Sequence, residues 1–134
     1  MRAKWAVAAA GLGLLVPAVP VLAHHSFGAE YDAKQPVTLK GTVTKFEWTN
    51  PHARFYIDVK DESGKVTNWN LELASPNVLG RSGWTRHSLN IGDQITVTGS
   101  RAKDGASMAN AARVTLADGK VVGARSADDG GPQQ

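Results

Sequence analysis

The chain has 134 residues, with 15 basic and 12 acidic side chains, a formal net charge of +3 and no cysteine. Without cysteine, neither a disulfide framework nor a thiolate metal site can form. The basic residues are scattered among acidic ones, whereas nucleic-acid-binding domains carry a clustered basic surface, so no nucleic-acid partner is expected.

The first 23 residues predict a cleavable signal peptide. Arg2 and Lys4 precede an 18-residue apolar run, and small residues stand before a cleavage point after Ala23. The alternative is a retained membrane anchor, for which a run of this length is about the minimum. Cleavage predicts a periplasmic or secreted protein of 111 residues with a net charge near +1 and no stable membrane span.

The rest of the chain is expected to have three parts. Residues 24–36 form an N-terminal segment, residues 37–122 a β domain, and residues 123–134 a polar, glycine-rich tail with the composition of a disordered segment. Within the β domain, alternating apolar and polar residues between turn signals predict strands over 37–48, 54–60, 66–73, 94–99 and 110–116, and a final hairpin into 121–122.

One short helix is expected between the third and fourth strands. Ser75 supplies an N-cap and Pro76 a first helical residue, and the helix should end near Gly83. This order predicts a mainly β fold, a five- to six-stranded OB-fold-like barrel with one short helix between strands three and four. A small β-sandwich is the alternative, but it leaves the helix without a role.

The alternation also assigns faces to the strands. Phe55 and Trp69 fall on the inward side, whereas Glu72 falls on the side expected to face water. Gly41 lies inside the first strand and indicates a bulge or a tight bend there.

Histidines are the strongest candidates for a functional site. Cleavage after Ala23 makes His24 the amino terminus, so that its α-amine and its imidazole can chelate one metal ion. His25 and His52 can each add an imidazole, and a set of amine and imidazole nitrogens favours Cu(II) over zinc. The sequence therefore predicts a copper site made by His24, His25 and His52.

A simpler interpretation of the histidines remains open. The paired histidines can be solvated surface residues, and His52, in the turn after Pro51, can merely cap that turn by hydrogen bonding to a backbone carbonyl.

Aromatic residues suggest a different function. OB-folds bind sugars or oligonucleotides with rings on strands two and three, and Trp48 and Tyr56 are the rings left free to face a ligand. The alternative hypothesis is therefore a non-metal binding module that recognises a peptide, a glycan or a partner protein. No set of residues forms a nucleophile, base and orienting group in recognisable order, so no catalytic residue is assigned and the protein is not expected to be an enzyme.

The sequence resembles a widespread family of small, uncharacterised bacterial exported proteins. The motifs that carry the resemblance are HHSF at 24–27, EWTNPH at 47–52, SPN at 75–77 and GWTR at 83–86. The resemblance implies export and an OB-fold but no activity. The family pattern has an acidic residue after Arg86, where this chain has His87, so His87 is the weakest candidate ligand among the histidines.

Overall fold

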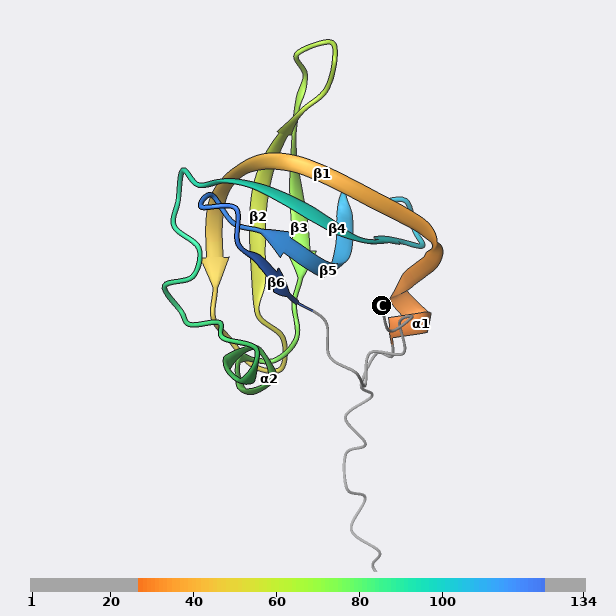
Figure 1. Cartoon of the computed structure of the whole chain (residues 1–134). Coiled ribbons are helices and arrows are strands. Elements are labelled where there is room, and N and C mark those ends of the chain that lie inside the picture. The colour runs from red at the N-terminus through yellow and green to blue at the C-terminus, as the bar shows by residue number, and fades with distance from the viewer. Residues whose placement is uncertain (1–26, 125–134) are drawn as a thin grey trace, which may run out of the picture.

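Six strands and two short helices make up residues 27–124, the part of the chain that the computed structural model describes (Figure 1). In chain order they are α1 (Phe27–Glu30), β1 (Tyr31–Glu47), β2 (Arg54–Lys60), β3 (Val66–Glu72), α2 (Pro76–Arg81), β4 (Gln94–Ala102), β5 (Met108–Thr115) and β6 (Val121–Gly123). The predicted signal peptide, His24, His25 and the tail from residue 125 lie outside the described residues.

The sheet has the order β3-β2-β1-β4-β5-β6, and it closes on itself where β3 pairs with β5. That closing pair is parallel and runs from Asn70 to Glu72 on β3, whereas the other pairs are antiparallel. A five-stranded ring with a helix between β3 and β4 is the OB-fold arrangement. The predicted fold class is therefore confirmed, and the β-sandwich alternative is wrong.

β1 is long enough to serve both sides of the barrel, because it pairs with β2 along its second half and with β4 along its first (Figure 1). Gly41 allows this crossing, since a Cβ atom there would lie 2.5 Å from the carbonyl oxygen of Asp58. Gly41 itself keeps regular register with Ile95, and the irregularity nearest to it lies between Val43 and Lys45. The bulge is thus a little later than the sequence suggested, and the glycine is needed for close backbone approach.

The first strand starts earlier in the sequence, and the last strand ends later, than the sequence predicted. β1 begins at Tyr31 and not at residue 37, because Tyr31 pairs with Ala102 on β4. At the other end β6 includes Gly123, and Ala124 is buried while its carbonyl accepts a hydrogen bond from Ala74 N–H.

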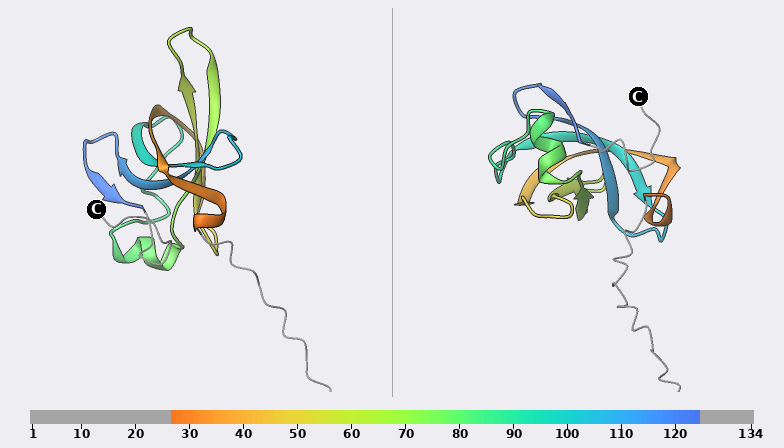
Figure 2. Two further views of the ribbon diagram at one scale, coloured as in Figure 1. Left: turned by 90° about the vertical axis from the view of Figure 1, so that its right-hand side faces the viewer. Right: turned by 90° about the horizontal axis from the view of Figure 1, so that it is seen from below.

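The core lies between the strands and is closed at one end by α2 and the residues after it. The predicted N-cap is present, with Ser75 Oγ accepting from Val78 N–H at 3.4 Å, and α2 ends at Arg81, slightly before the predicted end. Figure 2 shows α2 at one end of the barrel and the tip of the β2–β3 hairpin projecting from the other. Inward side chains from the strands fill the space between, among them Leu39, Val43, Phe55, Ile57, Leu71, Val97 and Val114.

Neither helix within residues 27–124 has the length and apolar character needed to cross a membrane.

Candidate functional site

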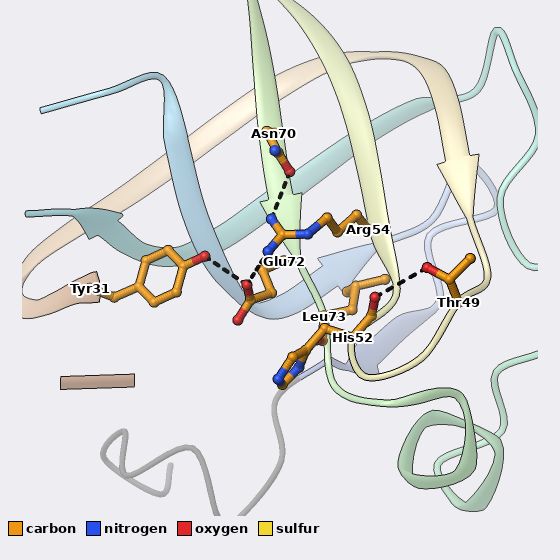
Figure 3. A network of polar contacts seen from close by, with 7 residues as sticks. All are labelled: Tyr31, Thr49, His52, Arg54, Asn70, Glu72 and Leu73. Carbon is orange, nitrogen blue, oxygen red and sulfur yellow. Dashed lines mark hydrogen bonds and ion pairs between the residues drawn. The ribbon is translucent and has the colours of Figure 1, made fainter. Parts of the chain in front are cut away.

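His52 lies in the turn between β1 and β2 (Figure 3). It is half-buried and follows Pro51, whose preceding peptide bond is cis. Its Nδ1 atom is 3.0 Å from the carbonyl oxygen of Leu73. A carbonyl can only accept, so Nδ1 carries the proton, and in the neutral ring Nε2 keeps its lone pair.

This one hydrogen bond fits both roles predicted for His52. It is the cap to a backbone carbonyl that the simpler interpretation requires. It is also the contact that metal-binding histidines commonly make through the nitrogen that does not bind the metal. The hydrogen bond therefore leaves the lone pair of Nε2 available, and the structure does not show what this atom binds.

A polar network lies next to Leu73, the residue whose carbonyl binds His52 (Figure 3). Glu72, the residue before Leu73, accepts on Oε2 from the Tyr31 hydroxyl at 3.0 Å and pairs with Arg54 Nη2 at 2.5 Å. Arg54 Nη1 also donates to Asn70 at 3.2 Å. Glu72 is only 7% exposed, so its expected place facing water is wrong: Tyr31, assigned to the segment before the barrel, lies against it.

The segment that follows His24 and His25 in the sequence is fastened to the barrel. The ring of Phe27 in α1 packs against the ring of Tyr31 at a tilt of 32°, with a centroid separation of 5.7 Å. Lys103, in the turn after β4, donates from its backbone N–H to the Glu30 carbonyl at 2.9 Å and from Nζ to the Gly28 carbonyl. Three separate contacts thus hold α1 and the start of β1 in place.

Among the three predicted copper ligands, His52 is the one that falls in the described part of the chain. Within residues 27–124, no group of three or more histidine, cysteine, aspartate or glutamate side chains could hold a metal ion. His87 is exposed in the loop after α2, where its backbone N–H donates to Thr85 Oγ1. A metal site with three such ligands at His52 would therefore need at least one ligand from outside residues 27–124.

The two aromatic residues of the alternative hypothesis lie in different surroundings. Trp48 is half-buried against the core and meets Phe46 edge to face at a centroid distance of 5.8 Å. Tyr56 lies on the outward side of β2, between the inward-facing Phe55 and Ile57, with Lys45 Nζ 5.3 Å from its ring centre. The aromatic binding face therefore stays a prediction.

The environment of Tyr31 predicts a loss of stability at alkaline pH. Burial, reinforced by the charge of Glu72 and their hydrogen bond, raises the pKa of the Tyr31 phenol above its ordinary value. The folded state keeps this proton after the unfolded state has lost it, so the stabilisation is complete below the unfolded pKa of about 10 and is lost as pH rises above it. Urea unfolding across this range should show a smaller alkaline decrease in the free energy of unfolding for Tyr31→Phe than for the wild type. An equal decrease in both proteins would contradict the prediction.

Two solved structures are similar to this chain. The crystal structure of the mitochondrial single-stranded DNA binding protein Rim1 from S. cerevisiae has 11% sequence identity and a TM-score of 0.48, over 61% of this chain and 92% of that one. The N-terminal domain of PriB protein from Thermoanaerobacter tencongensis has 17% identity and a TM-score of 0.42, over 62% and 96%. No curated protein matches the sequence.

A family model matches residues 10–111, which include all three predicted copper ligands, and the chain therefore belongs to the family of unknown function DUF6152.

Proposed function

We propose that this is an exported binding protein, cleaved after Ala23, that holds one copper ion through His24, His25 and His52 for delivery, sequestration or sensing. The observation that carries the proposal is the hydrogen bond from His52 Nδ1 to the Leu73 carbonyl, which leaves Nε2 as a fixed nitrogen donor. The donor set would be one α-amine and imidazoles, which suits tetragonal Cu(II).

The anchoring of α1 supports a contribution from the N-terminal histidines. His24 precedes Phe27 by three residues, and three residues of extended chain span about 10 Å. Phe27 packs on Tyr31, which binds Glu72, and the next residue, Leu73, binds His52. In Figure 3, Tyr31 lies near Glu72 at the end of β3, and His52 lies near Leu73, the residue that follows.

His52→Asn is the variant that separates copper binding from capping. The asparagine amide can replace Nδ1 as the donor to the Leu73 carbonyl but provides no counterpart of Nε2. We expect Cu(II) affinity to fall at least tenfold, about 1.4 kcal/mol, while the thermal midpoint of the metal-free protein stays close to that of the wild type. Affinity is measured by competition with a chelator, and the ligand set by electron paramagnetic resonance.

His87→Asn is the matched control, since it makes the same change at an exposed histidine and should leave Cu(II) affinity unaltered. Protein for these measurements is recovered from the periplasm, and its intact mass should correspond to a chain that starts at His24. A start at Ser26 would remove the chelate, and unchanged affinity in His52→Asn would remove the third ligand. Either result would overturn the proposed site.

A further inference from the structure

We propose that residues 27–32, which comprise α1 and the first two residues of β1, form a strap that opens and closes on a barrel that stays folded. Tyr31 is the latch of this strap, and residues 33–35 are its hinge. The strap controls whether the carboxylate of Glu72 is accessible, whether or not the protein binds copper.

The hinge lies where β1 leaves its ladder with β4. Asp32 and Pro36 pair with consecutive residues of β4, so residues 33–35 have no counterpart on that strand. All three are exposed, and the backbone N–H of Lys34 and the side-chain amide of Gln35 donate back to the Asp32 carboxylate. In Figure 1 the ribbon bends between the main part of β1 and α1. Exposed backbone held by such local bonds can change direction at little cost to the barrel.

The strap is packed outside the main core. None of the residues of α1 is buried. Tyr31 and the residue it pairs with on β4, Ala102, are 1% and 2% exposed, yet both lie outside the main hydrophobic cluster. The ring of Phe27 packs against Tyr31 from within the strap itself. Opening would therefore expose far less apolar surface than unfolding of the barrel, and it should need less free energy.

The latch is a hydrogen bond to a carboxylate that the barrel holds in place. The Tyr31 hydroxyl donates to Glu72 Oε2 at 3.0 Å, and Arg54, opposite Glu72 in the register of β2 and β3, pairs with the same oxygen. Lys103 adds two hydrogen bonds to carbonyl groups of α1. Opening takes the hydroxyl away from the carboxylate and leaves Glu72 paired with Arg54.

Amide hydrogen exchange followed by NMR tests whether the strap opens separately. The Lys103 amide, which donates to the Glu30 carbonyl, reports on the strap, and the Val43 amide, which donates to the Asp93 carbonyl, reports on the barrel. After correction for intrinsic rates, we expect Lys103 to exchange at least about tenfold faster than Val43, with a weaker dependence on urea, because less surface is exposed. Equal rates and equal urea dependence would overturn the strap.

Two variants separate the latch from the core. Tyr31→Phe keeps the ring that packs against Phe27 and loses the hydroxyl, so exchange at Lys103 should accelerate about tenfold. Ile57→Val weakens the barrel core and should accelerate exchange at Val43 but not at Lys103. No change at Lys103 in Tyr31→Phe would overturn the latch, and acceleration at Lys103 in Ile57→Val would overturn separate opening.

Thr44→Val is the matched control for the lost hydroxyl. It removes a hydroxyl that donates to the Tyr56 carbonyl, away from the strap, and should leave exchange at Lys103 unchanged.

Introduced thiols give an independent measurement, because the chain has no cysteine. Ala102→Cys places a thiol beside Tyr31, and Ala111→Cys places one in the main core. A thiol reagent should modify residue 102 faster than residue 111, and Tyr31→Phe should increase the rate at residue 102 further. Equal rates at both positions would show that residue 102 is reached only when the barrel unfolds, and would overturn the strap.

Discussion

Replacing Trp84 by alanine is expected to lower the free energy of unfolding by about 3–5 kcal/mol, the range for truncating a buried aromatic side chain. Trp84 follows α2 and is 2% exposed. Its ring lies 6.4 Å from that of Phe46, and its Nε1 donates to the Gly123 carbonyl at 2.8 Å. The side chain thus ties the segment after α2 to both β1 and β6, and alanine would leave a cavity at this end of the barrel.

Two further variants test this assignment by urea unfolding followed by circular dichroism. Trp84→Phe keeps much of the burial but loses the hydrogen bond, so a smaller decrease is expected. Trp69→Ala should cost less than Trp84→Ala, because Trp69 is only half-buried and lies beneath the guanidinium of Arg101, 5.5 Å from its ring centre. A larger loss for Trp69→Ala would show that Trp84 does not have the structural role assigned to it.

The strands and turns could be predicted because their signals are local. Phe55 and Ile57 alternate with polar residues, which marks their face as inward, and both are fully buried. Ser75 and Pro76 identify the start of α2 through the chemistry of two adjacent residues. The order of these elements was sufficient for the OB-fold topology.

The start of β1 could not be found in this way. The residues between Asp32 and Pro36 are exposed and carry no alternation of apolar and polar side chains, although the segment pairs at both ends with β4. That pairing depends on Arg101 and Ala102, far along the chain. The alternation put Glu72 on the face expected to meet water, and it could not show that the Tyr31 hydroxyl binds this carboxylate, so the burial of Glu72 was missed.

The candidate site was predictable only in part. The sequence located His52 in a turn after β1, and the structure places it there. The partner of its Nδ1 atom is the Leu73 carbonyl, 21 residues away, and such a contact becomes visible only when β2 and β3 are paired. His24 and His25 lie outside the described residues, so their role stays a prediction.

Glu72→Gln is the second substitution with a large expected effect. Glutamine keeps the size of the side chain but removes the charge that balances Arg54, whose side chain is 29% exposed against 9% for Glu72. Breaking a fully buried ion pair costs about 3–5 kcal/mol. Because Arg54 keeps some contact with water, we expect a decrease of roughly 2–4 kcal/mol in the free energy of unfolding. Glu62→Gln, in the exposed β2–β3 turn, is the matched control and should leave urea unfolding unchanged.

A double variant shows whether this loss comes from the unbalanced charge of Arg54. Arg54→Met combined with Glu72→Met removes both charges and keeps apolar volume, and such replacements of buried pairs are commonly neutral or stabilising. We therefore expect the double variant to be more stable than Glu72→Gln, even though it lacks every hydrogen bond of the pair. If it is less stable, the carboxylate of Glu72 contributes mainly through its hydrogen bond from Tyr31, and the charge of Arg54 is accommodated by solvent.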